Sequence, residues 1–409
     1  MSLGHGAKIV TDGLQFAYDM GSVRSWKGKP TTNAIPSPDF DAGLTAPYQY
    51  VSGTGASIQI VSDPSAPSPH KRVLKHINPN ASESTTGPHS GASSRLLSAA
   101  SGQTWTGSVY VRTETPGTQL EMFVFGLNAS NSYINFSSGS KTIQPEDGWV
   151  LFTKSHTFTD ANVTGITTRL DVNNNATVYW SNWQLEQSSF ATQFVNGARS
   201  NSQSIIDWKG GNDVFISTSS TRINHINASS FEYVQDGTSS ATTSNIAGSN
   251  TQTKYTRIVW FKPTVLGSNK YIMLNSVGNN ADMCIHINNS KVSFHQYTNS
   301  NTNGTTSGDF SVDGTTTLVA GQVYCGAIVV DRTLTTNNIK VYLNGELETT
   351  GSRQIGNSGS SGIRFATASS YLSGRDYAGE IYAAYHYDRL LTDDEIKQNF
   401  NALRGRFGI

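Results

Sequence analysis

The sequence has little cysteine and no long apolar run. Its 409 residues include two cysteines, Cys284 and Cys325, with no CxxC spacing, so we expect no disulfide framework and no cysteine-based zinc site. We expect both thiols to be reduced and packed inside strands. The sequence contains no run of about 18 apolar residues, which is the length that a membrane-spanning helix needs. Residues 1–6 also lack the apolar core of a secretory signal, so none is expected.

Charged residues are scarce as well. They make up 14% of the chain, against about 25% in an average globular protein. Lys plus Arg and Asp plus Glu both number 29, so the formal net charge is zero. A nucleic-acid-binding protein needs a cationic face to displace counterions from phosphates, and a long coiled coil needs charged flanking positions. The composition argues against both, and we expect neither nucleic acid nor membrane as a partner.

Strand signals dominate the sequence. Serine, threonine, asparagine and glycine provide its polarity, and these residues suit turns and strand-rich surfaces. Several segments alternate apolar and polar side chains with a period of two, as half-buried strands do. These segments are residues 108–112, 120–125, 177–183, 257–261 and 339–343.

Two hairpins are predicted among these strands. Asn344-Gly345 follows residues 339–343, and an Asn-Gly pair readily adopts the positive φ angles of a type I′ turn. A second hairpin runs from Cys284 to Tyr297 and turns at Asn289-Ser290. Its alternation predicts one apolar face and one mixed face. The apolar face holds Ile285, Ile287, Val292 and Phe294, and the mixed face holds Cys284, His286, Ser293 and His295.

One helix is predicted, near the end of the chain. Thr392 to Glu395 forms a capping box, and Ile396, Phe400 and Leu403 follow at helical spacing. Gly405 is expected to end the helix. One short C-terminal helix after many strands predicts an all-β fold of two β-sandwich or jelly-roll domains.

Six segments carry a family resemblance. Residues 9–14, followed by Tyr18-Asp19, resemble the opening strand of laminin-G-like (concanavalin A-like lectin/glucanase) sandwiches found in structural proteins of tailed bacteriophages. Later segments continue the resemblance in the same order. They are residues 206–212, 231–237, 258–263, 341–345 and 377–382. The resemblance implies a virion structural protein, either a tail fibre or adhesin or a capsid decoration or fibre subunit.

The middle of the chain resembles a different module. Residues 108–112 and 179–186 are similar to strands of carbohydrate-binding-module jelly rolls, and residues 191–200 resemble the segment by which such jelly rolls exit in phage proteins. We therefore predict a lectin-like sandwich from residues 1–30 plus 200–409, with a jelly roll of residues 31–199 inserted in its first loop. The alternative is a separate N-terminal strand that pairs with the middle block.

Catalytic signals are weak. Strand carboxylates spaced Glu-x-Asp-x-Glu would suit a glycosidase, but no such triple occurs, and Glu346 and Glu348 flank a hairpin turn. Arg112 to Glu114 and Ile285-His286 resemble fragments of polysaccharide-lyase motifs, in different predicted domains. We predict that the protein is not an enzyme. The alternatives are a free-standing glycan-binding protein and, less favoured, a polysaccharide lyase or glycosidase.

Aromatic residues are the better indication of function, because sugars stack their apolar C–H faces on rings. The carbohydrate-binding candidates are Trp105, Tyr179, Trp183, His286, His295 and Tyr297. Core packing is the alternative for the rings, and a solvated strand face is the alternative for the histidines. Trp180 is expected on the opposite strand face from Tyr179, and Trp183 on the face of Tyr179 only where a bulge intervenes.

The remaining expectations concern cofactors and partners. No cofactor is predicted; Ca²⁺ is an open alternative, with Asp171 and Asn173 as oxygen ligands but no assigned site. The resemblance implies other virion proteins and host surface glycans as partners, and a homo-oligomer. It also implies a place on the virion surface after assembly in the host cytoplasm.

Overall fold

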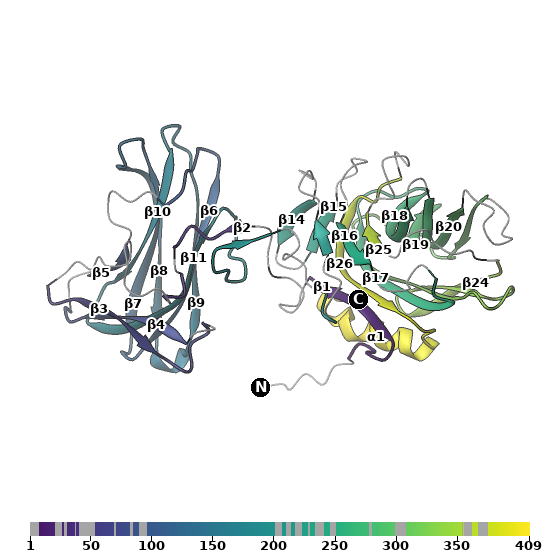
Figure 1. Ribbon diagram of the computed structural model, residues 1–409, viewed down its shortest axis with the longest axis horizontal. Helices are drawn as coiled ribbons and strands as arrows, with labels where there is room; N and C mark the ends of the chain where they lie inside the picture. Colours follow the sequence, from purple (N-terminus) through teal and green to yellow (C-terminus); the bar gives the residue numbers. More distant parts are fainter. Residues whose placement is uncertain are drawn as a thin grey trace. The chain divides into compact units, whose positions relative to one another are not determined.

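A computed structural model shows that the chain divides into two compact units (Figure 1). Unit 1 consists of Met1–Lys29 and Ser200–Ile409, and unit 2 consists of Pro30–Arg199. The structure describes residues 8–20, 27, 31–36, 38–40, 54–68, 71–81, 85–89, 96–200, 207–209, 214–216, 223–227, 230–233, 241–245, 251–277, 280–298, 308–353, 355, 362–366 and 375–409.

Unit 1 is a sandwich of two antiparallel sheets. The eight-stranded sheet has the order β14-β15-β26-β17-β22-β23-β24, with β1 also paired to β26. Its strands are β1 (Leu14–Asp19), β14 (Ile223–Asn227), β15 (Ser230–Tyr233), β17 (Lys254–Pro263), β22 (Tyr324–Asp331), β23 (Ile339–Leu343), β24 (Glu346–Gly351) and β26 (Gly379–Tyr387). The seven-stranded sheet has the order β13-β16-β25-β18-β19-β20-β21. Its strands are β13 (Val214–Ile216), β16 (Ala241–Asn245), β18 (Lys270–Val277), β19 (Asn280–Asn288), β20 (Lys291–Thr298), β21 (Gly308–Asp313) and β25 (Gly362–Phe365).

The first strand of the chain lies in the same sheet as its last strand. β1 pairs antiparallel with β26, from Leu14 opposite Tyr387 to Asp19 opposite Ala383. Phe16 and Tyr18 of β1 are buried in the core between the two sheets of unit 1. Residues at the two ends of the sequence therefore share one core, while residues 30–199 form a unit of their own.

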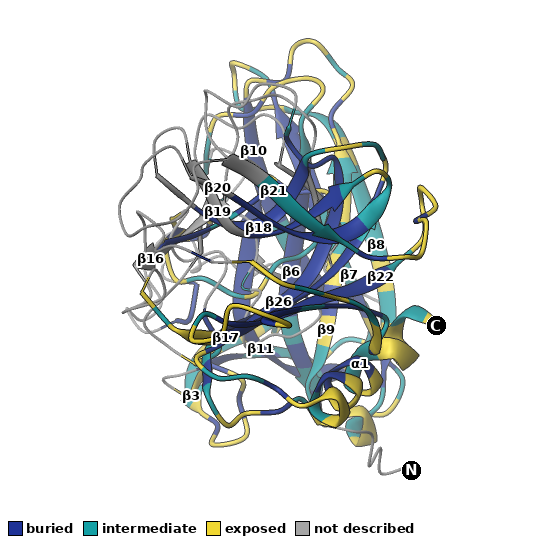
Figure 2. Ribbon diagram, turned by 90° about the vertical axis from the view of Figure 1, so that its right-hand side faces the viewer, coloured by how far each residue is buried: buried dark blue, intermediate teal, exposed yellow. Residues whose placement is uncertain are grey.

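The eight-stranded sheet buries side chains on both faces. On β17, Val259 and Phe261 face the seven-stranded sheet, whereas Trp260 faces the C-terminal helix α1 (Asp393–Phe407). Phe400 and Phe407 of α1 stack on the Trp260 ring, with centroids 5.6 and 4.9 Å away. Figure 2 shows the result, with buried strands β17, β22 and β26 and an α1 that is exposed on its outer side. The helix thus covers apolar side chains that alternation alone would leave in water.

The start of α1 is confirmed, but its predicted end is wrong. Thr392 is the N-cap and accepts a hydrogen bond from the Glu395 N–H, while the Glu395 side chain accepts one from the Thr392 N–H. The helix continues through Gly405 and ends at Phe407, with Gly408 as the left-handed C-cap. The contact of Phe407 with Trp260 stabilises the additional turn, and this contact outweighs the low helix propensity of Gly405.

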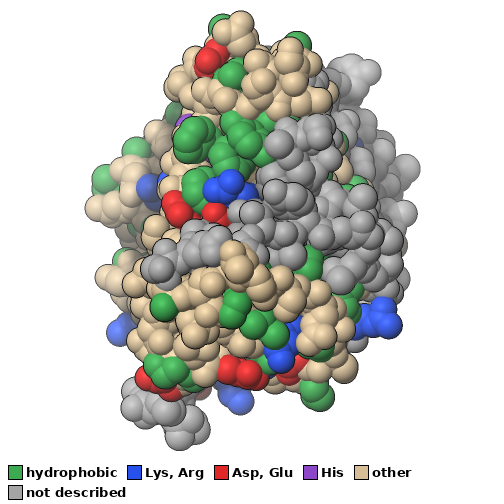
Figure 3. Space-filling view, turned by 90° about the vertical axis from the view of Figure 1, so that its left-hand side faces the viewer, with side chains coloured by type: hydrophobic (Ala, Val, Ile, Leu, Met, Phe, Trp, Pro, Cys, Tyr) green, Lys and Arg blue, Asp and Glu red, His purple; other side chains and the backbone are tan. Residues whose placement is uncertain are grey.

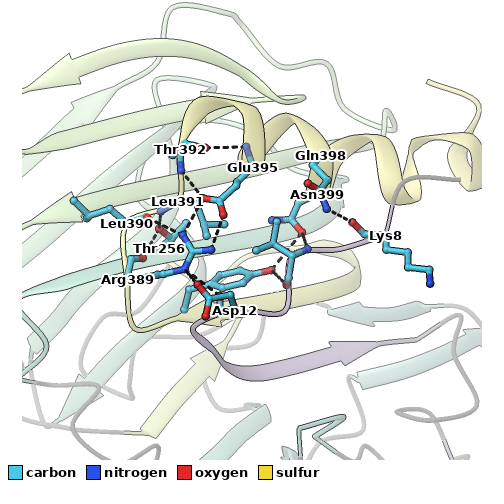
Figure 4. A network of polar contacts seen from close by, with 12 residues as sticks. Lys8, Asp12, Thr256, Arg389, Leu390, Leu391, Thr392, Glu395, Gln398 and Asn399 are labelled. Atoms are coloured by element: carbon cyan, nitrogen blue, oxygen red, sulfur yellow. Dashed lines mark hydrogen bonds and ion pairs between the residues drawn. The ribbon is translucent and has the colours of Figure 1, made fainter.

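A network of polar contacts holds residues 8–10 against α1 (Figure 4). The Asn399 side chain accepts a hydrogen bond from the Val10 N–H at 2.9 Å, and the Tyr387 hydroxyl donates to the Val10 carbonyl at 2.9 Å. Gln398 donates to the Lys8 carbonyl at 2.7 Å. These bonds satisfy backbone groups of Lys8 and Val10, which lie outside any strand.

Both predicted hairpins are confirmed. β19 and β20 turn at Asn289 and Ser290, whose φ angles are 48° and 60°. β23 and β24 turn at Asn344 and Gly345, with φ angles of 51° and 83°. The apolar face of the first hairpin packs between the two sheets, as the alternation predicts. Its members there are Ile285, Ile287, Val292 and Phe294.

Unit 2 is a second sandwich. Its five-stranded sheet has the order β3-β4-β11-β6-β9, and its four-stranded sheet has the order β5-β10-β7-β8. The strands are β3 (Ser57–Ser62), β4 (Arg72–Asn78), β5 (Thr85–His89), β6 (Thr104–Thr113), β7 (Thr118–Leu127), β8 (Tyr133–Ile143), β9 (Val150–Thr157), β10 (Gly165–Val172) and β11 (Ala176–Glu186). A 3₁₀ turn, η1 (Pro145–Asp147), precedes β9, and β2 (Thr31–Thr32) pairs with β12 (Ala198–Arg199). Apolar side chains of both larger sheets form one core. The predicted all-β fold with a C-terminal helix is confirmed.

Candidate functional site

The predicted carbohydrate-binding residues lie in different places. Trp105 of β6 and Trp183 of β11 are buried in the core of unit 2, where they contact apolar neighbours from both sheets. Tyr179 lies on the opposite face of β11, in a small cluster with Ala66 and Val73. In these positions the two tryptophan rings present no open face. Their role in sugar binding stays a prediction, as does that of Tyr179.

The bulge in β11 is present, but its predicted effect is wrong. Pairing with β6 shifts register between Ser181 and Gln184, so β11 has one additional residue there. In a regular strand, residues 179 and 183 share a face; the additional residue reverses that parity. Trp183 therefore joins Trp180 in the core, and the bulge separates it from Tyr179.

The histidine pair of unit 1 is brought together and buried. His286 and His295 lie on the face of the seven-stranded sheet that points away from the core between the sheets. Their ring centroids are 4.7 Å apart, and both contact the Tyr271 ring. Burial holds the pKa of His286 well below its usual range, and the neighbouring His295 and Arg375 lower it further. The His286 ring is therefore neutral at pH 7. Tyr297 belongs to β20, and its side chain lies outside the described residues.

A pocket of about 310 Å³ lies on the outer face of the five-stranded sheet of unit 2. It combines apolar surface with hydroxyl and carboxamide groups, and none of its lining side chains is charged. The lining residues are Pro67, Ser108, Tyr110, Leu151, Asn182, Thr192, Gln193 and Phe194. A concave site with apolar walls and a few polar groups is the usual form of a small-molecule site.

Strand alternation positions the floor of the pocket. In β6, Ser108 and Tyr110 point outward because Val109 and Val111 point into the core. Leu151 of β9 is the cross-strand partner of Tyr110 and is 43% exposed. A large apolar side chain and a tyrosine ring therefore lie side by side at the mouth of the pocket.

The β11 bulge positions the third strand of the floor. Its additional residue is Asn182, which has a φ of 53°, a conformation that asparagine tolerates better than most residues. The side chain is 7% exposed, and its Oδ1 has no hydrogen-bond partner among the described residues. The bulge thus places a carboxamide in the pocket lining at a position that does not follow the inward–outward alternation of a regular strand.

Buried ionic contacts hold the pocket wall formed by residues 192–194. The Glu186 carboxylate accepts hydrogen bonds from the N–H and hydroxyl of Thr192, at 2.7 and 2.9 Å. Arg199 donates to the same hydroxyl at 3.0 Å and to the Gln193 carbonyl. The Val195 N–H donates to Gln184 at 2.8 Å. These hydrogen bonds hold the backbone of the wall and so position the side chains of residues 193 and 194.

Charged groups beside the pocket neutralise one another. Arg112 donates to Asp63 at 2.8 Å, and its guanidinium lies 4.3 Å from the centre of the Tyr179 ring. The Tyr179 hydroxyl donates to Glu114 at 2.7 Å; burial, and then that bond, raises the pKa of Tyr179 to about 12. Although burial opposes it, the hydrogen bonds from Ser65 and Arg112 lower the pKa of Asp63. Figure 3 likewise shows charged side chains of both signs in small groups on one face of the molecule.

Several polar groups of the pocket are free to bind a ligand. The buried Asn182 Oδ1 has no hydrogen-bond partner in the part of the chain that the structure describes. Ser108 and Tyr110 add hydroxyl groups to the lining, and Gln193 adds an exposed carboxamide. Ser108 and Tyr110 belong to a strand that the sequence predicts clearly. Their polar positions in its apolar–polar alternation could have identified them as residues of the outer sheet face. Asn182 and Gln193 could not be found in this way, because a bulge and a loop place them.

The described residues include neither a cluster of metal-ligating side chains nor a helix able to span a membrane. No group of three or more His, Cys, Asp or Glu side chains within them is placed to hold a metal ion. Asp171, considered above as a Ca²⁺ ligand, forms an ion pair with Arg169 at 3.0 Å. The helix that the structure describes is too short and too polar to cross a membrane.

Comparison with protein families identifies the larger unit. Residues 235–397, which form most of the C-terminal part of unit 1, match the family described as the concanavalin A-like lectin/glucanases superfamily. These residues are thus similar to a concanavalin A-like lectin/glucanase domain. The matched segment, named here the lectin-like domain, includes β17, β22 and β26 and the beginning of α1. The predicted laminin-G-like resemblance is confirmed for these residues.

Comparison with solved structures finds neurotoxin binding domains. The binding domain of botulinum neurotoxin DC in complex with rat synaptotagmin II is 18% identical, with 50% of each chain covered and a TM-score of 0.39. The same binding domain in complex with SialylT is 19% identical, with 50% of each chain covered and a TM-score of 0.39. The chain spans about half the length of these structures. A comparison with curated proteins finds no match.

Proposed function

We propose that this protein binds carbohydrate without transforming it, and that the sugar occupies the pocket of unit 2. One observation supports this most directly: the buried Asn182 Oδ1, which has no hydrogen-bond partner among the described residues, lies in one pocket with hydroxyl groups and apolar surface. A sugar ring presents the matching combination, an apolar C–H face edged by hydroxyl groups. Tyr110 would provide the stacking ring, and Ser108, Asn182 and Gln193 would bind hydroxyls.

The chemistry of the pocket favours binding over catalysis. Glycoside hydrolysis uses two carboxyl groups on either side of the scissile bond, and the pocket lining includes no carboxylate, histidine or cysteine. On the same sheet face, the Asp63 carboxylate is already held by Arg112. The lining can therefore hold a sugar by contact and hydrogen bonding, and it offers no acid or base for turnover.

The proposal also includes a domain arrangement. We propose that residues 31–199 are a carbohydrate-binding jelly roll inserted after the first strand of the lectin-like domain. The separate core of unit 2 and the pairing of β1 with β26 support this arrangement. Long surface insertions cost little loop entropy, and the ends of a domain often lie close together.

Glycan binding by the full-length chain tests the proposal. On a glycan array, the wild-type protein should bind a defined set of sugars. Tyr110→Ala should weaken binding about tenfold, because it removes the stacking ring. Asn182→Gly removes the carboxamide but preserves the positive φ, so it should weaken binding without unfolding the bulge.

The matched control for this experiment is Phe136→Ala. Phe136 is an aromatic residue, 56% exposed, on β8 of the other sheet of unit 2, and its removal should leave sugar binding unchanged. If no glycan binds, or if the control loses binding as strongly as Tyr110→Ala, the proposed site is wrong. Tyr297→Ala on the same array tests the predicted role of Tyr297 in sugar binding by unit 1.

We also propose a biological setting, a structural subunit on the virion surface of a tailed phage, in a tail fibre or on the capsid. The order of the sequence motifs and a neutral surface rich in hydroxyl and amide groups support it. Assembly in the host cytoplasm as a homo-oligomer, with contacts to other virion proteins, belongs to the same proposal. Immunogold electron microscopy with antibody against this chain should label intact virions, and unlabelled virions would contradict it.

A further inference from the structure

The pocket of unit 2 lacks any group that would attract an anionic sugar. None of its lining side chains is charged. On the same sheet face, Arg112 already pairs with Asp63 at 2.8 Å and lies 3.9 Å from Glu114. A ligand carboxylate would lose its hydration without gaining a free counter-charge. The pocket therefore suits a neutral ligand.

Its apolar surface exceeds what one sugar ring uses. Tyr110 provides a ring for the C–H face of a sugar. Leu151, 43% exposed although it lies on a regular strand, adds a branched aliphatic side chain next to that ring. Pro67 and Phe194 add further apolar surface to the lining. A hexose edge consists of hydroxyls, so this surface fits a ligand that also has a methyl group.

The free polar groups include two carboxamides. Asn182 and Gln193 each have a donor and an acceptor; the Asn182 Oδ1 is buried with no partner among the described residues, and the Gln193 side chain is exposed. A half-turn of an amide exchanges its oxygen and nitrogen, so Asn182 can offer the pocket either atom. An acetamido group has one N–H and one C=O, which point in opposite directions because its amide is trans. Two carboxamides can therefore bind it, each through one hydrogen bond.

We propose, building on the carbohydrate-binding function above, that the ligand is a neutral sugar with an N-acetyl group. The acetyl methyl contacts Leu151, and the acetamido N–H and C=O bind the carboxamides of Asn182 and Gln193. The sugar ring stacks on Tyr110, and Ser108 binds a ring hydroxyl. The N-acetyl group, and not the ring alone, selects the ligand.

Saturation-transfer NMR and calorimetry with the full chain test this inference. The probes are the methyl glycosides of N-acetylglucosamine, N-acetylgalactosamine, glucose and galactose. At least one N-acetylated sugar should bind tenfold or more tightly than the corresponding hexose, with the strongest saturation on its acetyl methyl. Hexoses that bind equally well, or an acetyl methyl that receives no saturation transfer, would overturn the inference but leave the proposed function intact. No binding by any sugar in this set or on the array would overturn both.

A variant separates the methyl contact from the rest of the site. Leu151→Ser should reduce the preference for the N-acetylated sugar over the corresponding hexose to less than threefold. Because Leu151 is already exposed, the variant should fold as the wild type does. Leu334→Ser is the matched control, a leucine that is 50% exposed in unit 1, and it should leave the preference unchanged. A Leu151→Ser protein that retains the full preference would contradict the assigned methyl contact.

Discussion

Arg389 lies between two carboxylates that come from opposite ends of the chain. Its guanidinium contacts Glu395 of α1 at 2.5 and 2.9 Å and Asp12, just before β1, at 2.9 Å. The hydrogen bond from Arg389 is the main cause of a Glu395 pKa lowered to about 2. Folding therefore favours the ionised carboxylate. Its contribution to stability is complete above the ordinary glutamate value of 4.5 and is lost as the pH falls toward 2.

Glu395→Gln should destabilise unit 1 in a pH-dependent way. Glutamine can preserve the capping bond from the Thr392 N–H, so the variant removes the charge and one of the two hydrogen bonds from Arg389. Because the Glu395 side chain is 26% exposed, we expect a loss of about 1–2 kcal/mol in the free energy of unfolding at pH 7. Urea titrations from pH 7 to 2.5 should show this difference shrinking below pH 4.5.

A surface ion pair provides the control for that prediction. Glu346 contacts Lys397 at 2.6 Å, but the two side chains are 69% and 55% exposed. Glu346→Gln should therefore change the free energy of unfolding by less than about 0.5 kcal/mol at any pH. A difference for Glu395→Gln that stays constant from pH 7 to 2.5 would show that the Arg389 contact does not act through charge.

At the level of elements, α1 offers a test of where the helix ends. Gly405 lies within the helix, and a Cβ built there meets no atom within 4 Å, whereas Gly408 has a left-handed φ of 69°. Gly405→Ala should therefore stabilise unit 1 by about 0.5–1 kcal/mol. Gly408→Ala should destabilise it by about 1 kcal/mol. Hydrogen exchange of the α1 amides measures both, and a loss of protection in Gly405→Ala would contradict the extended helix.

The sequence predicts those elements whose signals are local. Asn344-Gly345 and the alternation around Asn289 encode their hairpins within a few residues, and Thr392 with Glu395 encodes the start of α1. The end of α1 depends on Trp260, which is far away in the sequence. Local reading at Gly405 could not include that contact, so it placed the helix end too early.

The candidate pocket shows the same limit more strongly. Tyr110 and Leu151 face each other only through the pairing of β6 with β9, and Asn182 reaches them only because β11 has a bulge. Alternation identifies polar faces within one strand but not the register between strands. Aromatic type alone selected Trp105 and Trp183, yet large rings also fill sandwich cores. A small-molecule site made by three strands and a loop therefore leaves little trace in any one segment.

At the scale of the whole molecule, the two units have separate cores. Leu170 of β10 is buried in the core of unit 2, and Ile328 of β22 is buried between the sheets of unit 1. Leu170→Ala and Ile328→Ala should each cost about 2–5 kcal/mol through lost contacts and a cavity. Since neither core includes residues of the other unit, each loss should stay within its own unit.

Native-state hydrogen exchange with mass spectrometry separates these outcomes in mild urea. In Leu170→Ala, protection should fall in β6, β7, β10 and β11 and persist in β17, β22 and β26; Ile328→Ala should give the reverse. The decisive peptide is β1, since its pairing with β26 predicts that residues 14–19 lose protection only in Ile328→Ala, although residues 31–199 follow them in the chain. Joint loss in both units would mean one cooperative fold. Loss of β1 with unit 2 would show that the first strand is not held by the C-terminal residues, and the insertion proposal would then fail.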